Sequence, residues 1–147
     1  QIRNSSEPGQ TVLDLFGGTG QLGIEALSRG AERAVFVDAS EDACKLIREN
    51  LKRVKMEKDA LVIRGDYLDY LSKCRENFDI VFLDPPYAEV FLENALKKLT
   101  EIDILQSGGI IVAERPVEKE LSLEFPGFSR SKDYKYGNTL LTVYRKL

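Results

Sequence analysis

A glycine-rich stretch near the start of the chain is the first place where residue types and spacing suggest chemistry. Gly17, Gly18 and Gly20 follow an apolar run and precede a helical pattern, and glycines at such a turn let the backbone approach a ligand with no Cβ in the way. The stretch matches G-x-G-x-x-G, and an acid, Asp38, follows about twenty residues later, as in dinucleotide-binding loops. The motif alone predicts a nucleotide ligand without identifying it.

The charge of Asp14 narrows that choice. Asp14 lies just before the glycines, on the strand that leads into the turn, so its carboxylate faces the ligand side of the loop. A carboxylate there repels a pyrophosphate, whereas it attracts a cationic ligand such as S-adenosylmethionine, with its amino group and sulfonium. Asp38 can accept the ribose hydroxyls of either ligand or cap a helix, for which Ser40 is at least as well placed. Asp66, in RGDYL, could accept an adenine amine or equally be a helix cap.

A second stretch, Asp84-Pro85-Pro86-Tyr87, closes the fourth apolar run, at the edge where ligands bind in open α/β sheets. Two successive prolines remove two N–H donors and leave rigid carbonyl oxygens. The Asp84 carboxylate and the Pro85 carbonyl could hold both N–H groups of an exocyclic base amine and offset the positive charge that develops on its nitrogen. Tyr87 offers a ring on which an extruded base can stack. The alternative is a strand that merely ends in a proline turn.

These residues need a scaffold, and short apolar runs that alternate with amphipathic helical patterns supply one. The alternation predicts βαβ units and an α/β fold with a doubly wound, mostly parallel sheet, and two strand-like runs around Gly137-Asn138 predict a final antiparallel β-hairpin. Gly30 is expected to end the first helix, Ser40 to cap the second, and Gly108-Gly109 to precede the fifth strand. The expected strands cover 11–16, 33–37, 60–64, 78–83 and 109–113, the helices 22–28, 41–54, 67–74 and 90–99, and the hairpin 128–136 and 139–145.

Composition limits the classes of function. With no histidine and with Cys44 and Cys74 far apart, zinc sites and histidine acid/base catalysis lose support, and both cysteines are expected to be free thiols. No run approaches the roughly eighteen apolar residues of a membrane span. The net charge of −3 argues against a general polyanion binder, so RNA binding needs a local basic patch. The C-terminal hairpin offers one, although lysines on edge strands also prevent sheet-to-sheet pairing; its members are Arg130, Lys132, Lys135, Arg145 and Lys146, with Asp133 as the only acid among them.

Taken together, DLFGGTG, VDAS, GDY and DPPY resemble the class I S-adenosylmethionine-dependent amino-methyltransferases in order and spacing. The stretches LDLFGGTGQLGIEALSRGAERAVFVDAS, DIVFLDPPY and KYGNTLLTVY narrow the resemblance to the bacterial RsmD-like family, over residues 10–144. That family methylates the N2 amine of a guanine in small-subunit (16S) ribosomal RNA. The sequence departs from the family pattern at two places. It has Gly17-Gly18-Thr19-Gly20 where the family commonly has A-G-S-G, and Asp38 where the family often has glutamate. Both replacements keep the chemistry of these positions.

The resemblance implies a Rossmann-like class I methyltransferase fold and a role for each motif. Catalysis is expected at Asp84, Pro85, Pro86 and Tyr87, with S-adenosyl-L-methionine as cofactor and no metal. The methionine part is expected at the glycine turn, the ribose at the end of the second strand and the adenine near Asp66. The expected cofactor-binding residues are Asp14, Phe16, Gly17, Gly18, Thr19, Gly20, Asp38, Ala39, Ser40, Gly65, Asp66, Tyr67 and Asp84.

The sequence as a whole predicts a cytoplasmic, monomeric RNA methyltransferase of one domain, residues 1–147, that acts on ribosomal RNA or on the assembling small ribosomal subunit and contacts no membrane. Because the chain begins at Gln1, without a Met or a signal pattern, an N-terminal segment is expected to be missing. Another DPPY methyltransferase, acting on adenine N6, cytosine N4 or a protein glutamine, is the first alternative. An NAD-binding oxidoreductase and a non-catalytic RNA-binding module are the others.

Overall fold

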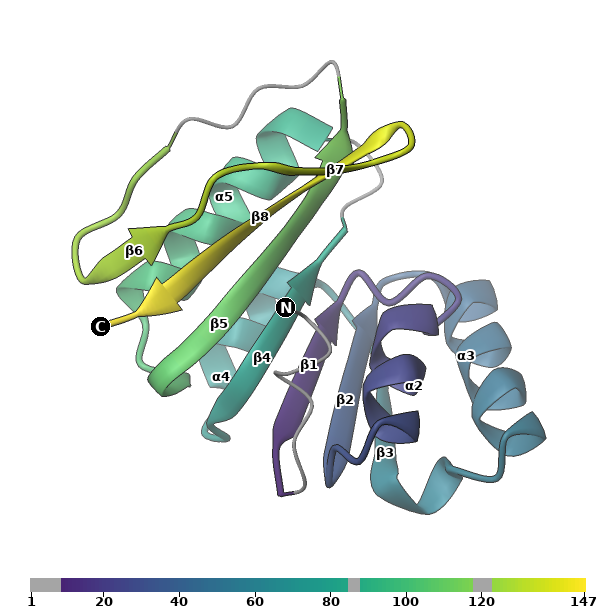
Figure 1. Ribbon diagram of the computed structural model, residues 1–147. Coiled ribbons are helices and arrows are strands. Elements are labelled where there is room, and N and C mark those ends of the chain that lie inside the picture. Colours follow the sequence, from purple (N-terminus) through teal and green to yellow (C-terminus); the bar gives the residue numbers. More distant parts are fainter. Residues whose placement is uncertain (1–8, 85–87, 118–122) are drawn as a thin grey trace.

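A single eight-stranded sheet runs through the computed structural model, which describes residues 9–84, 88–117 and 123–147. The strand order is β3-β2-β1-β4-β5-β8-β6, with β7 also paired to β8. The strands β1 to β5 are parallel, and β8 joins β5 in the antiparallel sense (Figure 1). The strands are β1 (Thr11–Leu15), β2 (Arg33–Asp38), β3 (Ala60–Arg64), β4 (Phe78–Leu83), β5 (Leu105–Pro116), β6 (Phe128–Arg130), β7 (Tyr134–Tyr136) and β8 (Thr139–Lys146).

Helices cover both faces of the sheet, which confirms the predicted doubly wound α/β fold. One face carries α2 (Gln21–Ser28) and α3 (Glu41–Arg53), and the other carries α4 (Tyr67–Lys73) and α5 (Ala88–Glu101) (Figure 1). A short 3-10 turn, Glu57–Asp59, leads into β3. Among the described helices, none is long and apolar enough to cross a membrane.

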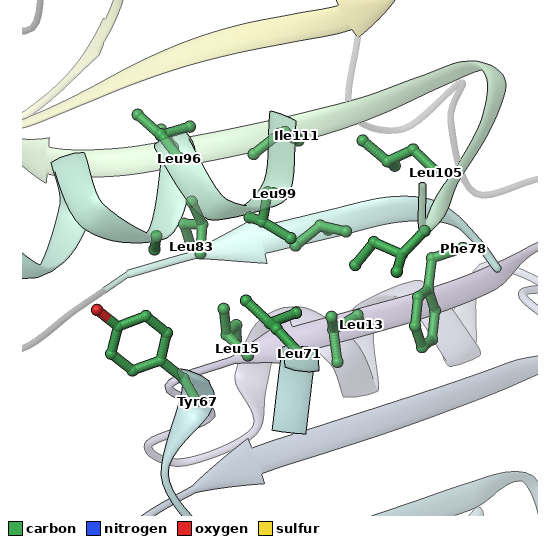
Figure 2. Packing of buried hydrophobic residues seen from close by; sticks show 14 of the residues in the cluster. Leu13, Leu15, Tyr67, Leu71, Phe78, Leu83, Leu96, Leu99, Leu105 and Ile111 are labelled. Atoms are coloured by element: carbon green, nitrogen blue, oxygen red, sulfur yellow. The ribbon is translucent and has the colours of Figure 1, made fainter. Parts of the chain in front are cut away.

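Each apolar strand contributes to two separate cores, because successive side chains point to opposite faces of a sheet. Val12, Phe36 and Val112 are among the buried residues of the core on the face that carries α2 and α3. Figure 2 shows the core on the other face, where Leu71 of α4 and Leu96 of α5 lie against side chains of β1 and β4. This division explains why the strands read as continuous apolar runs rather than as alternating ones.

The helix boundaries follow the residues expected to set them. Ser40 Oγ accepts the N–H of Ala43 at 3.1 Å, so Ser40 is the N-cap of α3. Gly30 follows the end of α2 with a φ of 106°, a conformation that suits glycine. Both predicted helix-end roles are confirmed.

The start of β5 differs from the prediction. Gly108-Gly109 lies inside the strand rather than before it, because β5 already pairs at Leu105 with Phe78 and then shifts register to pair Ile110 with Ile80. Gly108 takes a φ of 78° in this irregular part of the strand. A bulge of this kind interrupts the apolar pattern, so the pattern alone located only the regular part of the strand.

The predicted hairpin is confirmed at the turn around Gly137-Asn138, but its first arm is divided into β6 and β7, both paired with β8. The interruption at 131–133 is held by side chains: Ser131 Oγ accepts the Val143 N–H at 2.9 Å, and Thr142 Oγ1 donates to Asp133 Oδ1 at 2.7 Å. Arg115, whose side chain is 1% exposed, lies 3.0 Å from Asp133 and so joins β5 to this segment. Local side-chain bonds therefore replace the regular ladder here.

Candidate active site

The glycine turn after β1 is held from several directions. The Gly17 N–H donates to the carbonyl of Val37 at 3.1 Å, and the Gly20 N–H donates to the carbonyl of Gly17 at 2.7 Å. From α3, the side-chain amide of Asn50 donates to the carbonyl of Thr19 at 2.9 Å. The turn is thereby fixed against both β2 and α3.

Asp14, on β1, is only 3% exposed. Its Oδ2 atom accepts the N–H of Gly23, in the first turn of α2, at 3.0 Å. Burial raises the pKa of Asp14 to about 8; the bond from Gly23 opposes this rise, and the charges of Asp84, Asp38 and Glu114 add to it. With no cation beside it, Asp14 is therefore largely protonated at neutral pH, and a cation would restore the carboxylate.

Asp38, at the end of β2, uses both of its carboxylate oxygens within the chain. Oδ2 accepts the Gly18 N–H at 3.1 Å, and Oδ1 accepts the Ser40 N–H at 2.9 Å, so Asp38 joins the glycine turn to the start of α3. It is not the N-cap of α3, because Ser40 takes that place. Each carboxylate oxygen can accept a second hydrogen bond, so the predicted ribose contact is still available to Asp38.

Four carboxylates from four adjacent strands meet in one cavity of about 680 Å³. They belong to Asp14, Asp38, Asp84 and Glu114, which lie on or directly after β1, β2, β4 and β5. The cavity lies at the carboxyl ends of the parallel strands, where the strand order reverses between β1 and β4 and where ligands bind in sheets of this kind. Its other lining residues are the predicted Phe16, Gly17, Gly18, Thr19 and Ser40, together with Gln21, Leu22 and Ala43.

Glu114 is the acidic cavity residue that the sequence analysis missed. Leu83 and Ala113 are paired in register on β4 and β5, so the residues that follow them, Asp84 and Glu114, are neighbours. Desolvation raises the pKa of both carboxyls, and the charge of Asp84 raises that of Glu114 further. A signal was present, because AVFVD, IVFLD and IIVAE are three apolar runs that each end in an acid.

Other predicted site residues lie outside this cavity. Asp66 is the N-cap of α4, where its Oδ2 accepts the N–H groups of Leu68 and Asp69 at 3.0 and 3.2 Å. Gly65 and Asp66 line a separate hollow of about 420 Å³ beside α4. Tyr67 is buried, with its ring centroid 4.8 Å from that of Phe16.

Several parts of the predicted site stay untested. Gly20 and Ala39 are not among the residues that line the cavity, although both belong to the segments that form its wall. Pro85, Pro86 and Tyr87 lie outside the described residues. Their predicted roles, like the adenine contact of Asp66, are still predictions.

Most of the predicted basic patch is occupied within the chain. Arg130 pairs with Asp133 at 3.0 Å and Lys146 pairs with Asp103 at 2.8 Å. Arg145 donates to the carbonyl of Gly108 at 2.7 Å. These contacts favour a structural role for at least part of the patch, which the sequence left open.

Similar known proteins identify the family of this chain. The family model described as "Conserved hypothetical protein 95" matches residues 2–145. YlbH of Bacillus subtilis (strain 168), whose name proposes an rRNA methyltransferase activity, is 40% identical over 91% of this chain and 74% of its own length. Ribosomal RNA small subunit methyltransferase D of Haemophilus influenzae is 36% identical over 74% of this chain and 58% of its own length.

Among solved structures, a conserved hypothetical protein of Streptococcus pyogenes superposes with a TM-score of 0.87 at 33% identity, over 95% of this chain and 88% of that one. The chain spans about three quarters of the Bacillus protein and less than two thirds of the Haemophilus protein. The family match covers nearly all of the sequence and agrees with the RsmD-like motifs within it. The chain belongs to the conserved hypothetical protein 95 family, which is the RsmD-like family.

Proposed function

We propose that this chain is the S-adenosylmethionine-binding, catalytic domain of a methyltransferase that modifies the exocyclic N2 amine of a guanine in small-subunit ribosomal RNA. The family membership and the names of the relatives support the activity and the RNA substrate. The observation that carries the proposal is the cavity in which Asp14, Asp38, Asp84 and Glu114 meet behind the glycine turn. In this cavity, a glycine turn of the nucleotide-binding type lies beside carboxylates that can bind a cation and an amine.

The same cavity disfavours a dinucleotide. Two phosphates of NAD would enter a space lined by four acidic side chains, and they would oppose the ionisation of Asp14 further instead of offsetting its burial. In a partly desolvated site, like charges repel far more strongly than in water. A sulfonium and an ammonium group, in contrast, would offset the cost of ionising Asp14.

Three of the four carboxylates, those of Asp14, Asp38 and Asp84, have separate tasks in this proposal. S-adenosylmethionine supplies a methyl group that is already activated by the sulfonium, so the chain needs no group to activate it. Asp14 faces the positive end of the cofactor, and Asp38, held by the Gly18 and Ser40 N–H groups, accepts hydroxyls of the ribose. The main contribution to catalysis is position and charge, because the nitrogen must lie in line with the methyl–sulfur bond.

Asp84 acts on the amine itself. Its carboxylate accepts an N–H of the target nitrogen and offsets the positive charge that develops there as the nitrogen–carbon bond forms and the carbon–sulfur bond breaks. Partial desolvation raises the pKa of Asp84, which makes it a better acceptor for the proton that the methylated nitrogen then loses. The Pro85 carbonyl and the Tyr87 ring are proposed to hold the second N–H and the base plane.

Asp84→Asn in the full-length protein tests this function. Because the variant loses the charge but keeps the shape, we expect kcat to fall by about a hundredfold or more while the affinity for S-adenosylhomocysteine changes little. The assay uses unmethylated small-subunit RNA, naked and within assembling particles, and identifies the methylated nucleoside by mass spectrometry. Glu101→Gln, at the exposed end of α5, is the control and should retain the wild-type rate.

The product identifies the reaction. N2-methylguanosine supports the proposal, whereas N6-methyladenosine, N4-methylcytidine or methylglutamine assigns the chain to another amine methyltransferase. Calorimetry with NAD and with S-adenosylhomocysteine separates the two cofactor classes, and tight binding of NAD would overturn the proposal. A wild-type rate in Asp84→Asn would remove Asp84 from the mechanism.

A further inference from the structure

The carboxylate of Glu114 has no role in the proposed mechanism. It lies on β5 next to Asp84, one residue beyond the paired Leu83 and Ala113. Neighbouring parallel strands are about 4.8 Å apart, and residues in register point to the same face, so both carboxylates border one part of the cavity. A planar base whose amine reaches Asp84 therefore presents the adjacent atoms of its edge to Glu114.

Glu114 is half-buried, and within residues 9–84, 88–117 and 123–147 no side chain or backbone group forms a hydrogen bond or ion pair with its carboxylate. The adjacent cation, Arg115, points to the opposite face of the sheet and pairs with Asp133. The charged neighbour that acts on Glu114 is Asp84, which is also an acid. A half-buried acid beside another acid is stabilised when a ligand supplies a donor.

The chemistry of the bases identifies that donor. On the Watson–Crick edge of guanine, the N2 amine is adjacent to the ring N1–H, so two donor groups lie side by side. In adenine and cytosine, the ring nitrogen next to the amine carries a lone pair and repels a carboxylate. An enzyme that flips out its base commonly reads it by hydrogen bonds to this edge.

We propose that Glu114 is a specificity residue that accepts the N1–H of the target guanine while Asp84 holds its N2 amine. This inference rests on the function proposed above. It explains why a second acid follows β5 in the same register as Asp84, and it provides the means by which the cavity rejects adenine and cytosine. With the wrong base, the buried acceptor faces a lone pair instead of a donor, so the site discriminates strongly against that base.

The test compares two bases that share the N2 amine but differ at N1 and at O6, and the loss of O6 is the same for wild type and variant. Once the methylated nucleotide is located, RNA is assembled with either guanine or 2-aminopurine at that position; 2-aminopurine lacks the N1–H and presents a lone pair there. For the full-length wild-type protein, we expect kcat/KM for guanine to exceed that for 2-aminopurine by about tenfold or more, the usual worth of a hydrogen bond to a charged group. In Glu114→Gln, the side-chain amide can face either edge, so the ratio should approach one.

Asp38→Asn is the matched control, because it removes one charge from the same cavity at the position assigned to the cofactor. It should lower kcat/KM for both bases by the same factor and leave their ratio at the wild-type value. If Glu114→Gln also lowers both rates equally and keeps the ratio, Glu114 serves the cofactor or the fold, and this inference is wrong while the proposed function stands. If the wild-type protein produces no N2-methylguanosine at all, the proposed function fails first.

Discussion

At the scale of single residues, the site depends on Asp14, a carboxyl whose charged form is disfavoured by burial. Asp14 is 3% exposed, and burial raises its pKa to about 8, far above the usual value of 3.8. In the unfolded chain the group ionises near that usual value, so the native state holds a proton that the unfolded state has lost between about pH 4 and pH 8. Stability is therefore lost as the pH rises through this window, up to the pKa of the folded state.

Asp14→Asn should separate stability from binding. Because asparagine has no charge to desolvate, we expect the ligand-free variant to unfold at a higher temperature than the wild type at pH 8, with a gain of at least about 1 kcal/mol. The difference should shrink as the pH is lowered towards 5. Thermal unfolding of both proteins across this range measures it.

Whereas Asp14→Asn should raise the stability of the ligand-free protein, it should weaken the binding of S-adenosylmethionine. Saturating S-adenosylmethionine should stabilise the wild type by about 3 kcal/mol at a hundredfold excess over Kd, and it should stabilise Asp14→Asn far less because the counter-charge is lost. A variant that is less stable than the wild type at pH 8, or that binds the cofactor normally, would contradict the role given to Asp14.

At the scale of elements, the approach of α2 to the sheet positions the donor to Asp14. A Cβ built on Gly23 would lie 2.4 Å from Cε2 of Phe36 and 3.2 Å from Oδ2 of Asp14. The ring of Phe36 is fully buried, so it has no space into which to move. Glycine at this position therefore sets the distance between α2 and the strands β1 and β2, and with it the bond from Gly23 to Asp14.

Gly23→Ala should consequently destabilise the fold although alanine favours helices. The crowding of an overpacked core costs about 1 to 3 kcal/mol, against a helix-propensity gain of about 1 kcal/mol, so a net loss of up to about 2 kcal/mol is expected in chemical denaturation. Cofactor affinity should fall as well, because the helix must move away from Asp14. Gly65→Ala is the control for stability, since its Cβ would meet no atom within 4 Å; an equal loss in both variants would rule out crowding at α2.

At the scale of the whole molecule, the charge distribution limits how this chain meets RNA. The net charge is −3, the cavity is acidic, and Arg130, Arg145 and Lys146 of the C-terminal strands are bonded to groups of the chain itself. Within the C-terminal patch, only Lys132 and Lys135 remain outside these contacts and available to neutralise phosphates. Recognition by this chain should depend more on the base in the cavity than on the RNA backbone.

The salt dependence of RNA binding measures that balance. Each neutralised phosphate contributes about 0.7 to 0.9 to the slope of log K against log salt, so if the C-terminal patch offers RNA only Lys132 and Lys135, its contribution to the slope should be no steeper than about −2. Fluorescence anisotropy with small-subunit RNA fragments between about 50 and 200 mM salt provides the slope. A value of −6 or steeper would show that the basic patch binds RNA directly despite its internal contacts.

The sequence by itself determined the alternation of strands and helices, the glycine turn, and the acids that close β1, β2 and β4. These depend on local rules: apolar periodicity, the conformational freedom of glycine, and the placement of polar residues at strand ends. The same rules located Ser40 as a helix cap and the turn at Gly137-Asn138. They failed at the bulge in β5, where pairing with β4 overrides the local pattern.

Only the tertiary structure decided which acids share the site. Asp66 and Glu114 both follow apolar strands, but β3 lies at the edge of the sheet whereas β5 lies beside β4, so Glu114 reaches the cavity and Asp66 caps a helix outside it. The raised pKa of Asp14 likewise depends on burial beneath α2 and on three carboxylates from other strands. Strand order and burial depend on pairing between segments that are distant in the sequence, so they cannot be predicted from a local stretch of sequence.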